Sequence, residues 1–367
     1  MLNKLRLLAL LPLLILLTLT GAAAEERPTI ALGDSFPELN LTLSGPGHDR
    51  SYLGLGDNSV FTPGQVAAEL LLVELLNVHC VHCQMQAPAY NELFKRIEMN
   101  PSTRGRIKLI GVALGNLPEE VAAFRRTYQV PFPVVADPRF IVNRALGASA
   151  TPFSVYVRQD GSGQPGVVAK THLGLNTDYQ EVFAELRQLL SVDPAELRRQ
   201  GAAAVHIRTA ISPLYGEEAL AGLVRKAFLA TGGEMVAFEQ IALRSGRRVY
   251  TAVLRRGQDE VRLFAEVASR QSVCDICHDV HFLYLFDSRA QIVGFEPLQV
   301  TKYGNVLWTE EEAAWMRQRV VGQYLSAPRP FDPKVDAVTS ATISSAIIFD
   351  SLAQGEALLE ELHEKGY

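Results

Sequence analysis

The chain has 367 residues, of which 48% are hydrophobic and 20% are charged, and its formal net charge is −5 at pH 7. This length suggests two domains, and the mildly acidic balance argues against binding to nucleic acid or to an anionic lipid surface. The four cysteines fall in two close pairs, one in each half of the sequence. Two distant pairs indicate two redox or cofactor sites rather than one small domain held together by disulfides.

The first 24 residues have the pattern of an export signal. Lys4 and Arg6 precede an apolar run over residues 7–19, and a row of small residues ends at Ala24. The run is shorter than the roughly 20 apolar residues that a membrane span needs. We expect a signal peptide over 1–24 and a periplasmic or otherwise exported protein, which is membrane-associated only if this segment is not cleaved.

Cys80 and Cys83 are separated by two residues, after an apolar strand predicted over 70–76 and before a helix predicted over 89–97. A cysteine at a helix N-terminus is favoured as the thiolate, and a protonated His82 between the pair favours it further. The pattern predicts that Cys80 is the reactive thiol, with a lowered pKa. A structural disulfide and half of a zinc site are the alternatives.

Two further positions suit the same chemistry. Glu74 lies six residues before Cys80 in an otherwise apolar strand, where a buried carboxylate can take up and return the proton of Cys83. The alternative for Glu74 is a charged residue on the solvent face of the strand. Pro152 follows Thr151 just before a β-rich run, and we expect a cis peptide bond there, close to Cys80.

Together these residues resemble the thioredoxin family, and within it the periplasmic thiol reductases and the peroxiredoxin-like proteins. The resemblance implies a thioredoxin-like α/β domain over 28–192. It also implies that Cys80 is the nucleophile, that Cys83 resolves the mixed disulfide, and that Pro152 shapes the substrate groove. The sequence departs from the family at His79, where tryptophan is common.

The remaining elements of the first half alternate as this fold requires. Strands are predicted at 107–112, 132–136, 153–157 and 167–172, and helices at 118–128 and 179–190. Residues 193–215 are weakly patterned, and we interpret them as a connector with some helix.

The second half has a different pattern, which predicts an α+β, FMN-binding-like domain over 216–367. A helix is predicted first, followed by strands and two more helices. The predicted ranges are 217–230 for the first helix, 234–243, 247–254, 261–268, 282–286 and 291–300 for the strands, 310–324 for the next helix, and a last apolar helix that ends near 362.

A hydroxyl-rich segment in this half carries the cofactor prediction. Asp336, Thr339, Ser340, Ala341 and Thr342 resemble the signature Asp-x-x-Ser/Thr-Gly-Ala-Thr of the FMN-binding domain found in ion-pumping and electron-transfer flavoproteins. The resemblance implies FMN, bound covalently through its phosphate at Thr342, and small hydroxyl residues at a helix start suit a phosphate. Ser340 stands where glycine is usual, which disfavours close approach or a positive φ angle. The alternative is a helix cap without a ligand.

The second cysteine pair allows several interpretations. Cys274, Cys277 and His278 form the Cys-x-x-Cys-His pattern of covalent haem c, with His278 as the proximal iron ligand. Against haem, the motif runs directly into a strand and no distal ligand is evident. A second redox dithiol that passes electrons between the flavin and the first pair explains the same residues, and we prefer it. A structural disulfide and a metal site are the remaining alternatives.

These observations predict an exported enzyme, a thiol-disulfide oxidoreductase coupled to a flavin-binding electron-transfer domain. Its expected partner is a disulfide-bearing or other redox protein. The alternatives are a c-type haem electron-transfer protein and a peroxiredoxin-like antioxidant enzyme. A non-enzymatic binding module would require Cys80 and Cys83 to be inert.

Overall fold

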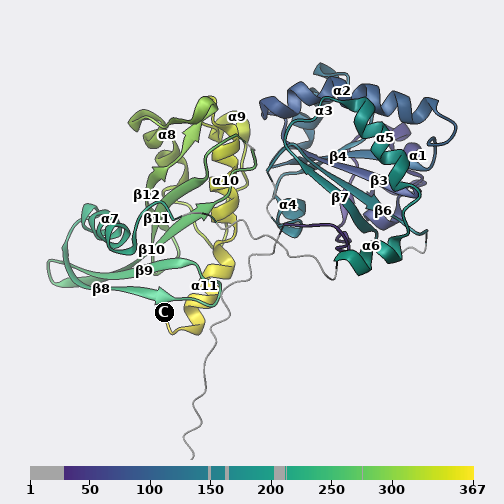
Figure 1. The fold of residues 1–367 in the computed structure, drawn as a ribbon. Helices are drawn as coiled ribbons and strands as arrows, with labels where there is room; N and C mark the ends of the chain where they lie inside the picture. The colour runs from purple at the N-terminus through teal and green to yellow at the C-terminus, as the bar shows by residue number, and fades with distance from the viewer. Residues whose placement is uncertain (1–28, 148–149, 162–164, 202–210, 212, 275) are drawn as a thin grey trace, which may run out of the picture.

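The computed structural model describes residues 29–147, 150–161, 165–201, 211, 213–274 and 276–367, which form an N-terminal and a C-terminal α/β unit (Figure 1). The predicted signal peptide lies outside the described residues. Within the described ranges, no helix combines the length and the apolar character that crossing a membrane requires.

The N-terminal domain is built on a five-stranded mixed sheet with the strand order β5-β4-β3-β6-β7. The three strands β3, β4 and β5 are parallel, whereas β6 is antiparallel to both β3 and β7. The strands are β3 (Leu70–Leu76), β4 (Ile107–Leu114), β5 (Val134–Asp137), β6 (Phe153–Arg158) and β7 (Val167–Leu173), and a short pair, β1 (Leu41–Thr42) and β2 (Val60–Phe61), lies apart from them. This arrangement is thioredoxin-like, as the sequence predicts.

Helices cover both faces of this sheet, so β3 is buried along its whole length. Its even-numbered leucines pack with α2, α3 and α5, and its odd-numbered apolar residues pack with α1 and α4. A strand that is buried on both faces has an almost continuous apolar sequence, and this pattern is why β3 could be predicted from the sequence. The helices are α1 (Gly47–Leu53), α2 (Val81–Met99), α3 (Pro118–Thr127), α4 (Ile141–Ala145), α5 (Tyr179–Leu189) and the one-turn η1 (Pro63–Gln65).

Two sequence expectations about helices in this domain need correction. The helix predicted over 89–97 begins eight residues earlier, at Val81, and contains Pro88. Part of the predicted connector forms helix α6 (Pro194–Gly201), whose Leu197 packs against Val167 and Ala169 of β7. This part of the connector therefore belongs to the N-terminal domain.

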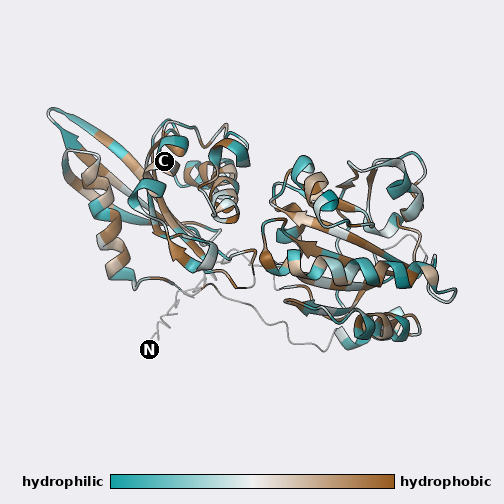
Figure 2. Ribbon diagram, turned by 90° about the horizontal axis from the view of Figure 1, so that it is seen from above, coloured by the Kyte–Doolittle hydropathy of each residue, from teal (hydrophilic) through white to brown (hydrophobic). Residues whose placement is uncertain are grey.

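The C-terminal domain is built on a five-stranded antiparallel sheet with the order β12-β11-β10-β9-β8. Neighbouring strands are consecutive in sequence, so the sheet is a simple meander. The strands are β8 (Glu234–Ala242), β9 (Arg248–Arg256), β10 (Asp259–Arg270), β11 (Val280–Asp287) and β12 (Ile292–Gln299), and β13 (Thr301–Lys302) pairs separately with β14 (Val306–Leu307). Figure 2 shows hydrophobic residues concentrated in the strands of both domains.

Helices α7 (Glu217–Ala230) and α10 (Thr342–Ala353) cover opposite faces of this sheet. The helix predicted over 217–230 is confirmed. The single apolar helix predicted to end near residue 362 is wrong, because the chain turns at Gln354 and continues as α11 (Gly355–Glu364). A Cβ atom at Gly355 would lie 2.7 Å from the Cβ atom of Leu325, so this turn brings two backbones close together.

The remaining short elements complete this domain. Helix α8 (Glu310–Val320) ends four residues before the predicted 324, where Gly322 takes a left-handed backbone with φ of 91°. The chain then forms α9 (Pro333–Asp336), and the one-turn helix η2 (Tyr303–Asn305) lies between β13 and β14.

The two domains contact each other through polar and apolar groups. Asp350 on α10 is buried and accepts two hydrogen bonds of 3.0 Å from Arg144 at the end of α4, and one of 2.8 Å from Arg270 on β10. One continuous apolar cluster also includes Leu146 of the first domain and Val273 of the second. The ion pair and this cluster fix the orientation in which the domains meet.

We predict that Asp350→Asn lowers the free energy of unfolding by about 1–3 kcal/mol, because two guanidinium groups lose a shared, buried acceptor. Glu364→Gln is the matched control, since Glu364 pairs with Arg244 at 2.9 Å but both side chains are more than half exposed. Loss of an exposed pair costs at most about 1 kcal/mol. Urea unfolding of both variants checks this, and equal losses would contradict the importance of Asp350.

Candidate functional site

Both cysteines of the first pair are buried at the start of α2, and neither is in a disulfide. Cys80 is the N-cap residue and has an extended backbone. Its thiol donates to the carbonyl oxygen of Thr151 at 3.6 Å, while the Sγ atom of Cys83 accepts from the backbone N–H of Asn77 at 3.5 Å. The strand-to-helix junction predicted from sequence therefore presents the pair at the carboxyl edge of the sheet.

Two asparagines hold the loop that carries Cys80, and sequence reasoning missed their role. Asn77 donates from Nδ2 to the carbonyl oxygen of Leu114 at 2.6 Å and accepts from the backbone N–H of His79 at 2.9 Å. Asn116 accepts from the N–H of Val78 at 3.0 Å. Polar residues placed directly after two adjacent parallel strands, β3 and β4, were the available signal.

Glu74 is 3% exposed, so the solvent-face alternative is wrong. Its carboxylate accepts from Gln86 Nε2 at 2.5 Å and from Ser154 Oγ at 2.6 Å, and the Ser154 hydroxyl lies 2.7 Å from the hydroxyl of Tyr90. Burial raises the pKa of Glu74 to about 8, although the hydrogen bond from Ser154 opposes this shift. Glu74 therefore exchanges protons near neutral pH.

Cys83 shares this buried environment. Burial raises the pKa of the Cys83 thiol well above its ordinary value, and its hydrogen bond to Cys80 and the negative charges of Cys80 and Glu74 raise it further. Cys83 is therefore held as a protonated thiol, and the charge of Glu74 contributes to this.

The Thr151–Pro152 peptide bond is cis, as the sequence predicts, and it lies beside Cys80. Thr151 also contacts the other domain, because its backbone N–H and its Oγ1 hydroxyl both donate to the carbonyl oxygen of Val273, at 2.8 and 2.6 Å. Sequence reasoning did not foresee this second contact, since 122 residues separate the partners.

The two histidines of the first motif take different positions. His79 is exposed, and its Nε2 lies 2.9 Å from a carboxylate oxygen of Glu120 on α3. His82 lies in the first turn of α2 and is half-buried. The influence of His82 on the Cys80 thiol stays a prediction.

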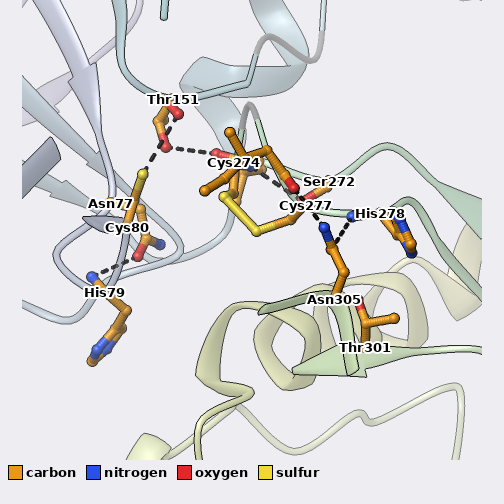
Figure 3. The surroundings of a disulfide bond; sticks show 12 residues. Asn77, His79, Cys80, Thr151, Ser272, Cys274, Cys277, His278, Thr301 and Asn305 are labelled. Atoms are coloured by element: carbon orange, nitrogen blue, oxygen red, sulfur yellow. Dashed lines mark hydrogen bonds between the residues drawn. A yellow bond between two sulfur atoms is a disulfide. The ribbon is translucent and has the colours of Figure 1, made fainter. Parts of the chain in front are cut away.

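The second cysteine pair forms a disulfide between Cys274 and Cys277 (Figure 3). Cys274 is buried and packs in the apolar cluster that contains Cys80 and Cys83, whereas Cys277 is only half-buried. Asn305 holds the loop by donating to the carbonyl oxygen of Ile276 at 2.8 Å and accepting from the N–H of His278 at 2.9 Å.

The disulfide is one redox state of the predicted dithiol and also suits a structural cystine, and haem attachment at these cysteines stays an alternative. Of the two histidines that follow, His278 is exposed, and His281 is buried on β11 with Nδ1 2.9 Å from Ser269 Oγ. Burial lowers the pKa of His281. The imidazole of His281 is therefore buried within the sheet and bonded to Ser269, which makes it a poor candidate for a second iron ligand.

A cleft of about 380 Å³ opens between the domains beside both cysteine pairs. The first domain contributes His79, Cys80 and Gln84 to its wall. The second domain contributes residues 301–305 after β12, residues 340–344 at the start of α10, and four residues around the disulfide, namely Ser272, Cys274, Ile276 and Cys277. A cavity of this size is in the range that holds a cofactor or small ligand.

The predicted FMN segment forms one wall of this cleft. Helix α10 begins at Thr342, with Ala341 as its N-cap residue, and the exposed Ser340 precedes them. Ser340 takes a left-handed backbone with φ of 61°, the conformation for which glycine is favoured at this position. The serine has thus kept the backbone shape that it was expected to disfavour.

The other two signature residues do not line the cleft. Asp336 is buried and accepts from both terminal nitrogens of Arg329, at 2.8 and 2.6 Å, so it braces the loop that precedes α10. Thr339 is exposed. The hydroxyls of Ser340 and Thr342 and the N-terminal N–H groups of α10 are therefore the groups that fit a phosphate.

Residues 61–168 match the AhpC/TSA family model. This segment contains the first cysteine pair and Pro152, so the match supports the redoxin part of the sequence analysis. It covers less than a third of the chain and ends well before the second cysteine pair. No curated protein matches the chain.

Several solved structures resemble about two fifths of the chain at low identity. A thiol:disulfide interchange protein of the thioredoxin family from Chlorobium tepidum TLS is 18% identical, with 45% of this chain and 98% of that chain covered and a TM-score of 0.32. StoA from Bacillus subtilis is 14% identical, with 41% of this chain and 96% of that chain covered and a TM-score of 0.30. AhpC from Mycobacterium tuberculosis is 17% identical, with 45% of this chain and 100% of that chain covered and a TM-score of 0.33.

We predict that Glu74→Gln changes how stability depends on pH. Because the folded-state pKa is raised from 4.5 to about 8, the folded protein retains a proton that the unfolded chain releases in this range. The wild-type free energy of unfolding therefore falls as pH rises from 4.5 to 8. Glutamine stays neutral and escapes this fall. As pH rises from 5 to 8, the free energy of unfolding of the variant should therefore increase by about 2–4 kcal/mol relative to that of the wild type.

Urea unfolding across this pH range measures the effect. Glu92→Gln is the matched control, because Glu92 lies on α2 but its side chain is 51% exposed. A Glu74→Gln curve that runs parallel to the wild-type and control curves would show that Glu74 is ionised in the folded protein.

Proposed function

We propose that this chain is an exported thiol-disulfide oxidoreductase whose second domain binds FMN and transfers electrons. The observation that carries the first half of this proposal is the arrangement around Cys80. This cysteine, which is in no disulfide, caps a helix N-terminus and bonds to the residue before a cis-proline, and a second thiol follows in the first turn of the helix.

Cys80 is the nucleophile in this proposal. Its thiolate attacks one sulfur of a disulfide in a partner protein, the partner's S–S bond breaks, and the other partner sulfur leaves as a thiolate. Cys83 then attacks the Sγ atom of Cys80 in the mixed disulfide. The partner leaves with two thiols, and Cys80 and Cys83 are left as a disulfide.

The second step requires Cys83 to lose its proton, which its raised pKa opposes. Glu74 is the proposed acceptor: with a pKa of about 8, a minor fraction of molecules carries an ionised Glu74 at neutral pH, and in these it takes the proton of Cys83 and releases it afterwards. Ser154 and Gln86 hold the carboxylate by hydrogen bonds of 2.6 and 2.5 Å. Glu74 thus acts on Cys83 rather than on the attacking thiolate.

The second half of the proposal rests on the start of α10. Ser340, Thr342 and the first N–H groups of the helix would hold the FMN phosphate, with Thr342 as the residue for covalent attachment. Tyr303 and Ile276, 68% and 51% exposed, offer apolar surface at the same cleft for a flavin ring. Bound FMN would convert two-electron dithiol chemistry into one-electron steps.

Export rests on the N-terminal sequence pattern, since the basic start, the short apolar run and the small residues up to Ala24 are typical of a signal peptide. In an oxidising compartment, the Cys274–Cys277 disulfide is the expected resting state. The proposed partner is accordingly an exported protein with a disulfide, or another redox protein.

A peroxiredoxin-like activity is the second candidate, favoured by the match of residues 61–168 to the AhpC/TSA family model. In this alternative the Cys80 thiolate attacks a peroxide oxygen, and Cys83 resolves the resulting sulfenic acid. Both candidates use the same two cysteines, so the substrate decides between them.

We predict that Cys80→Ser abolishes the acceleration that this chain gives to the reduction of a disulfide-bonded protein such as insulin by dithiothreitol, so that only the rate with dithiothreitol alone remains. Cys83→Ser should instead accumulate a mixed disulfide with the substrate through Cys80, because the resolving thiol is missing. Turbidity measures the reduction, and non-reducing gels with mass spectrometry identify the trapped residue. Glu92→Gln, on α2 with a side chain that is 51% exposed, is the control.

The same preparations should be tested with hydrogen peroxide as the substrate. Rapid peroxide consumption without insulin reduction would replace the oxidoreductase proposal with the peroxidase. Mixed disulfides that form through Cys83 instead of Cys80 would overturn the assignment of the nucleophile.

We predict that expression in a host that exports the protein and supplies a flavin-attaching enzyme gives a yellow protein whose fluorescence survives denaturation. Thr342→Ala should lose this fluorescence, and Thr339→Ala, in the same loop, should keep it. Gel fluorescence after denaturation is the measurement. Fluorescence released by denaturation would mean non-covalent FMN, a haem spectrum would favour the cytochrome alternative, and the absence of both would remove the flavin proposal.

A further inference from the structure

The segment that carries the second cysteine pair lies in the groove beside Cys80. Thr151 uses both its backbone N–H and its Oγ1 hydroxyl to bind the carbonyl oxygen of Val273, at 2.8 and 2.6 Å. Thr151 and Cys274 are also paired as a parallel β-bridge. The disulfide-bearing segment is thus bound to the first domain as an extended peptide, through its backbone.

Thr151 also positions the nucleophile. Its carbonyl oxygen accepts from the Cys80 thiol at 3.6 Å, so one residue holds both Cys80 and the segment with the disulfide (Figure 3). Cys274 is 5% exposed and packs in the same apolar cluster as Cys80 and Cys83. Cys277 is only partly buried at the edge of this cluster. Cys274 is therefore the sulfur that faces the first domain.

We propose that the Cys274–Cys277 disulfide is a tethered substrate of Cys80, and that two electrons pass between the pairs within one chain. This inference rests on the proposed thiol-disulfide exchange of the first domain and names the partner disulfide. In this proposal the contacts between the domains have a functional role, because the ion pair of Asp350 with Arg144 keeps the segment with the disulfide in the groove.

The exchange needs no outside reactant. The Cys80 thiolate attacks the Sγ atom of Cys274, the Cys274–Cys277 bond breaks, and Cys277 leaves as a thiolate that takes up a proton. Cys83 gives its proton to Glu74 and attacks Cys80, the Cys80–Cys274 bond breaks, and Cys274 leaves as a thiolate that takes up a proton as Glu74 releases its own to the solvent. The first pair ends as a disulfide, the second as two thiols, and both steps are reversible.

Because both cysteine pairs belong to one chain, the rate of the exchange between them should not depend on the protein concentration. A disulfide held in the groove by its own chain is present at a high effective concentration that does not depend on protein concentration. A disulfide of another protein has to displace the segment around Val273 before it reaches Cys80. The reduced second pair would remain on the wall of the cleft that Ser340 and Thr342 also line.

Trapping the mixed disulfide tests this proposal. The double variant Cys83→Ser with Cys277→Ser retains only Cys80 and Cys274, and oxidised glutathione supplies the oxidant. We expect a Cys80–Cys274 disulfide, identified by peptide mapping without reduction, that forms at the same rate when the protein is diluted tenfold. The matched variant Cys83→Ser with Cys274→Ser retains Cys80 and Cys277 and should form its disulfide at least tenfold more slowly.

Glutathione adducts without a Cys80–Cys274 bond, cross-links only between chains, or equal rates for both variants would overturn the proposal. If the double variants do not fold, the wild-type protein reduced with one equivalent of dithiol gives the same information. Alkylation and mass spectrometry should then find thiols distributed over both pairs within minutes, independently of dilution. Electrons that stay on one pair would refute the exchange.

A further variant separates this inference from the proposed function. Cys274→Ser with Cys277→Ser leaves the first pair intact and should still reduce insulin. If this variant reduces insulin while no Cys80–Cys274 bond forms in the trapping variant, the oxidoreductase proposal is supported and the tethered-substrate proposal is wrong. If it does not reduce insulin and Cys80 forms no mixed disulfide at all, the proposed function itself fails.

Discussion

The contact between Thr151 and Val273 is the interaction on which the arrangement of this protein depends. Thr151 is fully buried, and its backbone N–H, its carbonyl oxygen and its hydroxyl are all engaged. Two of these groups bind the second domain, and the third binds the thiol of Cys80. Because one residue forms all three bonds, any movement of the domains relative to each other also changes what lies beside the reactive sulfur.

Burial sets the protonation of Cys83 and Glu74. The pKa of Cys83 is raised by its apolar surroundings and by the charge of Glu74, whereas the lowered pKa of Cys80 stays a prediction from its place at the helix N-terminus. The same surroundings raise the pKa of Glu74 to about 8. The low-dielectric interior thus raises the pKa of both groups, as it would not for a carboxyl group or a thiol exposed to water.

The cleft between the domains brings three chemical features together. It is lined by Cys80, by the Cys274–Cys277 disulfide and by the hydroxyl-rich start of α10. The outermost of these segments, at Cys80 and Ser340, are 260 residues apart in the chain. Such proximity is what transfer of electrons through successive thiol pairs requires, since each exchange step needs direct contact between sulfur atoms.

Sequence alone determined the features that depend on local pattern: the buried strand before Cys80, the helix after it, the cis bond before Pro152, and the five strands of the second domain. Apolar periodicity and residue chemistry act over a few neighbours, so these features can be read in order along the chain. Only the tertiary structure decided whether Glu74 faces solvent or core, where the last helix breaks, and that Thr151 meets Val273. These depend on contacts between residues distant in sequence, whose partners no local pattern specifies.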